Sequence, residues 1–138
     1  MRERLQALAA FLPLFEKPGF VYGTWHKSEQ EKPGVFVLPH FEPSETAVSF
    51  VHTAYDQGWV LVDWAWSAWI KTEEAVSMRD DPAALAVASP KQLAKLLTVL
   101  IRQDRYVEGA LNSAFESGLL TAIIRREAEL VEQDDKWN

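Results

Sequence analysis

Cysteine is missing from this 138-residue chain, and its absence excludes disulfides, thiolate metal sites and a cysteine nucleophile. Long hydrophobic runs are missing as well, because the longest charge-free stretch, residues 5–15, has 11 residues. A helix needs roughly 18 or more apolar residues to cross a bilayer, so no transmembrane span is expected. Glu16, Lys17 and Pro18 stand where a signal peptide would have small residues for cleavage, and we therefore expect a cytoplasmic protein.

Positive charge is in the minority, with 14 Lys and Arg against 20 Asp and Glu and a net charge of −6. This balance disfavours nucleic acid as a partner, because a protein that follows a phosphate backbone needs an excess of basic side chains. The sequence motifs of zinc peptidases, dinucleotide- and ATP-binding proteins and α/β-hydrolases are also absent. With 48% hydrophobic and 25% charged residues, the composition is typical of a single soluble globular domain over residues 1–138.

The N-terminal third of the chain combines a short helix with a hairpin. Apolar residues recur at helical spacing over residues 5–15, and Pro13 predicts that this helix kinks or ends just before it. Residues 20–25 and 35–38 are rich in β-branched and aromatic side chains, and the polar segment 27–34 joins them. These features predict an antiparallel hairpin with a long loop.

Capping chemistry predicts the elements that follow. Ser44 is a suitable N-cap and Gly58 a suitable stop, which predicts a helix between them. Residues 59–62 are expected to form a buried strand, after which Asp63 would cap a helix that begins at Trp64. The middle of the chain is thus expected to alternate helix, strand and helix.

The C-terminal half has the signals of consecutive helices. Asp81 before Pro82 has the chemistry of a helix start, and Ser89 with Gln92 three residues later forms a capping box around a proline at the first helical position. A following helix is expected to end at Gly118, and a last helix comes after it. This half is therefore predicted to be helical.

The last helix should hold the apolar residues between positions 119 and 131, while the polar tail 133–138 is expected to be frayed. No internal repeat or low-complexity segment interrupts this order. Together the elements predict an α+β fold, with a small antiparallel sheet of two or three strands covered by helices and a helical C-terminal half.

The most unusual segment is residues 102–109, where charged side chains continue an apolar helix face. Asp104 lies four residues after Leu100, so a carboxylate points toward the side of the core. Burying it alone would be costly, and we expect it to find partners among the neighbouring charges. The predicted network of arginines and carboxylates comprises Arg102, Asp104, Arg105, Glu108 and Glu116.

Two interpretations of this network are open. The structural one, which we favour, is that it fixes the junction between two helices. The functional one makes Arg102 or Arg105 an anion clamp for the carboxylate or phosphate of a ligand, with a neighbouring carboxylate orienting the clamp. A hydrolytic pair is not supported, because Glu108 and Glu116 on one continuous helix would lie roughly 12 Å apart.

Tryptophan is abundant, with six residues, and four of them lie between positions 59 and 69. They could supply a stacking surface for a base or sugar, with Asp63 accepting a hydrogen bond from the ligand. The helical spacing of Trp66 and Trp69 favours core packing instead, and Asp63 then serves as a helix cap. The candidates for the surface are Trp25, Trp59, Trp64, Trp66 and Trp69, of which Trp64 and Trp66, with Asp63, are the candidate ligand-binding residues.

Histidine is scarce, and His26, His40 and His52 are the only imidazoles. In the predicted hairpin His26 lies near the loop and His40 about six residues away, which corresponds to roughly 20 Å. Unless the predicted hairpin is wrong, this separation is incompatible with shared ligation. We therefore expect neither a metal nor another cofactor.

A longer pattern of residues resembles a known family. Its most specific element is the run Asp-Arg-aromatic-any-Glu-Gly at positions 104–109, with Glu116 and Gly118 after it. The pattern resembles domain of unknown function 6508, a family of small bacterial proteins, over nearly the whole chain. The resemblance implies a self-contained bacterial domain and brings no activity with it. Further matching positions are Leu12, Pro13, Phe15, Tyr55, Asp56, Gly58, Asp63, Trp64, Trp69, Leu111 and residues 20–25 and 39–41.

Two features favour a non-catalytic binding or protein-interaction module. Catalytic motifs are absent, and aromatic residues are present beside a charged helix junction. Its partner would be an unknown protein or a small anionic ligand. The alternative is a small enzyme that acts on an anionic metabolite or nucleotide, in which Arg105 binds the charge and Asp104, Glu108 or Glu116 is the general base. A homodimer that buries the tryptophan face is a third possibility.

Overall fold

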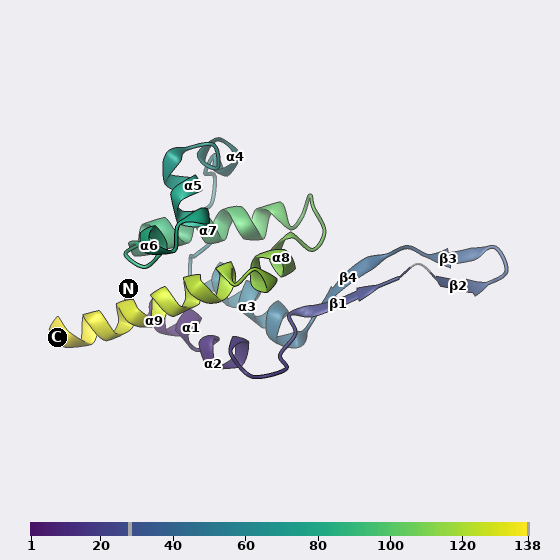
Figure 1. Cartoon of the computed structure of the whole chain (residues 1–138), viewed down its shortest axis with the longest axis horizontal. Coiled ribbons are helices and arrows are strands. Elements are labelled where there is room, and N and C mark those ends of the chain that lie inside the picture. The colour runs from purple at the N-terminus through teal and green to yellow at the C-terminus, as the bar shows by residue number, and fades with distance from the viewer. Residues whose placement is uncertain (28, 138) are drawn as a thin grey trace.

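The computed structural model describes residues 1–27 and 29–137 and contains a helical body from which a two-stranded arm projects (Figure 1). The long helix α9 runs through the middle of the body, with α1 and α2 packed along it. Helix α7 lies on the other side and contacts the short helices α4 and α5, while α6 packs against α5 and α9. The helices are α1 (Arg2–Ala9), α2 (Leu12–Phe15), α3 (Glu45–Asp56), α4 (Trp66–Trp69), α5 (Glu73–Asp80), α6 (Pro82–Leu85), α7 (Pro90–Gln103), α8 (Ala110–Glu116) and α9 (Leu119–Trp137).

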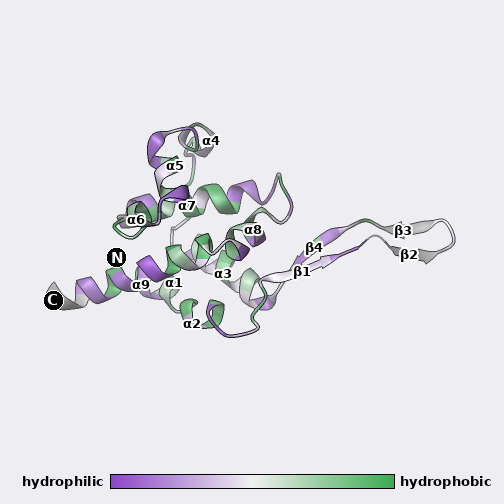
Figure 2. Ribbon diagram, in the orientation of Figure 1, coloured by the Kyte–Doolittle hydropathy of each residue, from purple (hydrophilic) through white to green (hydrophobic). Residues whose placement is uncertain are grey.

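The hydrophobic core lies where α1, α3, α7 and α9 meet, because each of these helices turns an apolar stripe inward. Hydrophobic and hydrophilic residues alternate along α7 and α9 in Figure 2, as expected for helices with one buried face. No helix in the described part of the chain has the length and hydropathy needed to cross a membrane. The side chains that are completely enclosed include Leu8, Phe50, Leu93, Leu97, Leu120, Ile123 and Ile124.

The first helical segment is interrupted as Pro13 predicts. Helix α1 ends at Ala9, and Pro13 occupies the first turn of α2, where its missing N–H removes no helical hydrogen bond. The break therefore comes a few residues before the proline itself.

The arm is an antiparallel ribbon in two parts, and its register differs from the expected one. At the base, β1 (Gly23–His26) pairs with β4 (His40–Pro43), so that His26 lies opposite His40. Farther out, β2 (Glu29–Lys32) pairs with β3 (Val35–Val37). The prediction that residues 20–25 pair with 35–38 is wrong, because the polar segment expected to be a loop contains a strand of its own. A ribbon without a covering layer needs no apolar face, so β-propensity alone could not fix its pairing.

Helix α3 has the predicted ends. The Ser44 hydroxyl accepts a hydrogen bond from the Ala47 N–H at 3.1 Å, and Gly58 follows the helix in the left-handed conformation with φ +76°. The serine satisfies one of the unpaired N–H groups of the first turn, and the glycine reverses the chain without steric cost.

Residues 59–62 do not form the predicted strand. Trp59 and Val60 are buried, but Val62 is 77% exposed. The Leu61 N–H donates to the Thr98 hydroxyl of α7 at 2.9 Å, so a side chain replaces the partner strand that the prediction required.

The predicted helix start at Asp63 and Trp64 is also wrong. Asp63 lies in an exposed turn with φ +52°, and α4 begins two residues after Trp64, with Ala65 as its N-cap. The Asp63 side chain consequently lies outside the first turn that it was expected to cap. The next helix, α5, was missed by the sequence argument although Thr72 caps it with a hydrogen bond from the Ala75 N–H.

The C-terminal helices agree with the expected starts. Asp81 caps α6, and Ser89 and Gln92 form the predicted capping box at the start of α7. Helix α8 is followed by Gly118, as predicted. Helix α9 extends to Trp137, and position 138 lies outside the described residues, so the expected fraying of the tail 133–138 stays a prediction. The α+β class with a helical C-terminal half is confirmed.

Candidate functional site

The junction between α7 and α8 is held by Asp104. This residue is the C-cap of α7, and its Oδ1 accepts a hydrogen bond from the Leu111 N–H in the first turn of α8 at 3.1 Å. The first N–H groups of a helix have no partner within it, so a carboxylate at this place accepts a hydrogen bond from one of them. Its negative charge is also attracted to the positive N-terminal end of the helix dipole. Asp104 thus ties two helices together across the loop between them.

The same loop holds the base of the arm. The Glu108 Oε1 accepts a hydrogen bond from the Phe41 N–H on β4. Gly109 has φ +83°, and a Cβ at this position would overlap the indole ring of Trp25 on β1. The Asp-Arg-aromatic-any-Glu-Gly run therefore contacts both strands at the root of the arm.

The remaining charged residues of the run have separate partners. The Arg105 guanidinium donates to the Tyr55 hydroxyl of α3 at 3.1 Å, and Glu116 accepts a hydrogen bond from the Asn112 side chain at 3.1 Å. The buried Nε of Arg102 has no hydrogen-bond partner among the described residues.

The predicted network of arginines and carboxylates is consequently wrong as a network. Within residues 1–27 and 29–137, no ion pair joins Arg102 or Arg105 to a carboxylate of the run. The spacing argument assumed a helix that continues past residue 103, whereas the chain turns there. Free backbone N–H groups then compete for the carboxylates, and exposed ion pairs gain too little in water to prevent it.

A cavity of about 280 Å³ lies between α3, the base of the arm and the loop from α7 to α8. Asp104, Glu108 and His52 lie on its wall. The sequence predicted the two carboxylates, but not their common cavity. The complete lining is Tyr22, Phe41, Pro43, Ala47, Val48, Val51, His52, Asp104, Glu108, Gly109 and Leu111.

Tyr22 is the most deeply buried polar residue of this lining, with 3% of its surface exposed. Its ring packs against Phe41 and Phe115. Burial raises the pKa of the phenol, and the negative charge of Asp104 raises it further, so the hydroxyl remains protonated. No described residue forms a hydrogen bond with that hydroxyl. Sequence reasoning missed this residue, since nothing in a β-rich run distinguishes a cavity-facing tyrosine from a core one.

A larger groove of about 590 Å³ separates α5 and α6 from α8 and α9, but it is a weaker candidate. Its charged residues, Arg79 and Asp80, pair with each other at 2.8 Å. Small and apolar side chains such as Ala114 and Leu85 make up much of the rest. Binding sites combine an apolar wall with a few convergent polar groups, and the two carboxylates of the smaller cavity each have an oxygen without a hydrogen-bond partner among the described residues.

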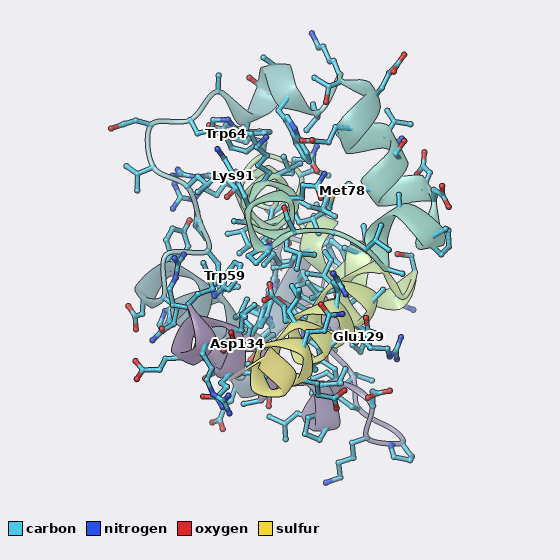
Figure 3. The ribbon with its side chains drawn as sticks, turned by 90° about the vertical axis from the view of Figure 1, so that its left-hand side faces the viewer. Trp59, Trp64, Met78, Lys91, Glu129 and Asp134 are labelled. Carbon is cyan, nitrogen blue, oxygen red and sulfur yellow. The ribbon has the colours of Figure 1, made fainter. Side chains whose placement is uncertain are left out.

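The tryptophans do not share one surface. Trp59 and Trp69 are buried, and their indole N–H groups donate to the Arg4 carbonyl and to Glu74. Trp59 and Trp64 lie in different parts of the molecule (Figure 3). Trp64 packs against Trp69 at 5.5 Å between ring centroids, and Trp66 packs against Tyr106 at 6.2 Å. The favoured interpretation, core packing, is correct for Trp59 and Trp69.

Two of the histidines lie together, contrary to the expected separation of roughly 20 Å. The rings of His26 and His40 stack at 4.8 Å, and the His26 Nε2 lies 2.7 Å from the Glu42 carboxylate. The error comes from the register of the arm, which places these residues opposite each other. Among the described residues no group of three or more His, Asp or Glu side chains is arranged to hold a metal ion.

Comparison with known proteins gives one match. Residues 1–133 match the family model described as "Family of unknown function (DUF6508)", in agreement with the resemblance seen in the sequence. No curated protein matches the chain. No solved structure matches it either.

Proposed function

Because the chain belongs to DUF6508, a family of unknown function, we propose from the site itself that it is a non-catalytic binding module whose ligand enters the cavity at the base of the arm. One observation carries this proposal. Asp104 and Glu108 border a preformed cavity, and each uses one carboxylate oxygen to hold the backbone while the other has no hydrogen-bond partner among the described residues. Convergent polar groups on an apolar wall are typical of ligand sites.

The arm supports an interaction with a protein partner. A two-stranded ribbon alone is at best marginally stable in water, and this one extends away from the helices (Figure 1). Trp25 at its base is 51% exposed and Leu38 is 77% exposed. Exposed aromatic and aliphatic side chains at such a place are typical of protein contacts. The proposal includes the location expected from the sequence, the bacterial cytoplasm.

A small enzyme remains the second candidate, on one observation. His52 and two carboxylates border the same cavity, and these side chains are the ones that general acid–base catalysis uses. The anionic substrate expected from the sequence is not favoured, because Arg105 is bound to Tyr55 and does not line the cavity.

A thermal-shift screen of a metabolite and peptide library tests the proposal. Val48→Trp fills the cavity from its rim, where Val48 is 40% exposed on α3. Val76→Trp is the matched control, since Val76 is 42% exposed on α5 and lies outside the lining. We expect compounds that raise the melting temperature of the wild type and of Val76→Trp but not of Val48→Trp.

Each compound that passes this comparison is then incubated with the protein and analysed by mass spectrometry. Recovery of the unchanged compound supports a binding module, and conversion supports the enzyme. If every stabilising compound acts equally on Val48→Trp, the cavity is not the binding site and the proposal is wrong.

A further inference from the structure

We propose that the cavity at the base of the arm selects an alkylammonium group, that is, a protonated primary amine on an apolar stem. A lysine side chain of a partner and a free diamine both carry this group. The inference rests on the proposed function, because it names the ligand class of the same cavity. It also reverses the sign of the ligand charge that the sequence suggested.

The charge of the lining is the first argument. Asp104 and Glu108 contribute two carboxylates, and no lysine or arginine belongs to the described lining. Arg105, next to Asp104 in the chain, is turned away to Tyr55. A cation that enters this cavity gains two favourable interactions, whereas an anion would be repelled by both carboxylates.

The hydroxyl of Tyr22 also favours a cation, because it has no hydrogen-bond partner in the part of the chain that the structure describes. This residue is 97% buried and borders the cavity together with Asp104. A protonated phenol offers lone pairs as acceptors. An ammonium group has three N–H donors and no acceptor. The Tyr22 hydroxyl and the second oxygens of Asp104 and Glu108 offer three acceptors on this wall, the same number as the donors of an ammonium group.

The apolar part of the wall suits the stem of such a ligand. Phe41, Val48, Val51 and Leu111 line the cavity together with the polar groups. Long amines bury their methylene groups against apolar surface while the charged end is hydrogen-bonded. The volume of about 280 Å³ admits one such chain and is small for a nucleotide.

The surface next to the cavity also carries carboxylates. A shallow groove along α3 shares Pro43, Val48 and His52 with the cavity and is also lined by Glu45 and Asp56. A second positive group, either the other amine of a diamine or the next basic residue of a peptide, would find these carboxylates. With a net charge of −6, the whole chain also attracts cations over longer distances.

Isothermal titration calorimetry of the full chain with four probes tests the inference. Nα-acetyl-lysine amide and 1,4-diaminobutane carry the ammonium group. The Nζ-acetylated form of the lysine probe keeps the stem without the charge, and glutarate is the anionic probe. We expect at least one amine to bind saturably, at least tenfold more tightly than the acetylated probe, and glutarate not to bind.

Isosteric variants locate the binding. Asp104→Asn and Glu108→Gln keep the oxygen that accepts the backbone hydrogen bond and remove the charge, and Tyr22→Phe removes the hydroxyl alone. Each carboxylate variant should weaken amine binding about tenfold, and Tyr22→Phe about threefold. Glu132→Gln changes an exposed carboxylate of α9 outside the cavity and should leave the affinity unchanged.

The outcomes separate the possible sources and failures. Binding of the lysine probe alone identifies a protein partner, and binding of the diamine alone identifies a free metabolite. The inference is wrong if the wild-type protein binds the acetylated probe as tightly as the amines, or if it binds neither amine saturably. Neither result depends on a variant. If Val48→Trp then still blocks neutral or anionic library compounds, the proposed function stands and only the ligand class is wrong.

Discussion

At the scale of single residues, Glu127 is the most exceptional side chain. It lies on α9 with none of its surface exposed, and neither carboxylate oxygen has a hydrogen-bond partner among the described residues. Burial raises its pKa to about 8, although the charges of Arg4 on α1 and Arg126 on α9 act in the opposite direction. The carboxyl group is therefore mostly protonated in the native protein at neutral pH.

This residue makes the stability of the protein depend on pH. The native state holds the Glu127 proton up to about pH 8, whereas the unfolded chain releases it near the ordinary pKa of 4.5. The raised pKa of Glu127 therefore stabilises the native state fully below pH 4.5, and this stabilisation is lost as pH rises toward 8. It amounts to at most roughly 5 kcal/mol of the free energy of unfolding. Urea denaturation at pH 5 and pH 8 should show a loss of stability that Glu127→Gln reduces. An equal loss in both proteins would contradict this assignment.

Gly109 provides a second prediction at this scale, with Gly118 as its control. Both glycines have positive φ, +83° and +88°, so an alanine at either position pays the cost of the left-handed conformation. Only at Gly109 would the added methyl group also overlap the ring of Trp25, because nothing lies within 4 Å at Gly118. Gly118→Ala should cost about 1 kcal/mol and Gly109→Ala about 2 to 5 kcal/mol. Chemical denaturation measures both, and equal costs would show that the Trp25 contact is unimportant.

At the scale of elements, the sequence predicted the helix starts that depend on neighbouring residues. It did not predict the pairing and contacts that depend on residues distant in the chain. The starts of α3, α6 and α7 follow from Ser44, Asp81 and the pair Ser89–Gln92, which act within three residues of themselves. The register of the arm depends on pairing across the ribbon. The ion network failed for the same reason, since Glu108 binds the backbone of Phe41, a residue 67 positions away.

Thr98 shows how one side chain can substitute for a strand partner. Its hydroxyl accepts a hydrogen bond from the Leu61 N–H at 2.9 Å and donates to the Ala94 carbonyl at 2.7 Å. Thr98→Val keeps the shape and leaves the Leu61 N–H unpaired, which should cost about 1 to 3 kcal/mol. Thr121→Val on α9, where Thr121 makes no hydrogen bond through its side chain within the described residues, should change stability by less than about 0.5 kcal/mol. Urea denaturation of both variants checks the difference, and similar costs would refute the role of Thr98.

At the scale of the whole molecule, the helical body and the outer arm are separable. The outer strands β2 and β3 pair with each other, and the ribbon extends away from the helices (Figure 1). The core residues belong to the helices and to the segments that join them. The body should therefore fold without the outer part of the arm.

Replacing residues 27–39 by a two-residue Asn-Gly turn tests this separation, because such a turn closes an antiparallel pair directly after His26 and before His40. We expect a single cooperative thermal transition within a few degrees of the wild type, measured by circular dichroism. Binding of the small ligand should persist, while binding of a protein partner through the arm should be lost. A fall of the melting temperature by more than about 10 °C would mean that the outer strands contribute to the core.

The contact between Glu108 and the Phe41 N–H also has a consequence for synthesis of the chain on the ribosome. The two residues are 67 positions apart, and translation proceeds at about 5 to 20 residues per second. The ribbon thus leaves the ribosome roughly 3 to 13 s before the loop that fixes its root, at those rates. For that interval the root of the nascent arm lacks the hydrogen bond to this loop, so its native attachment is completed only late in synthesis.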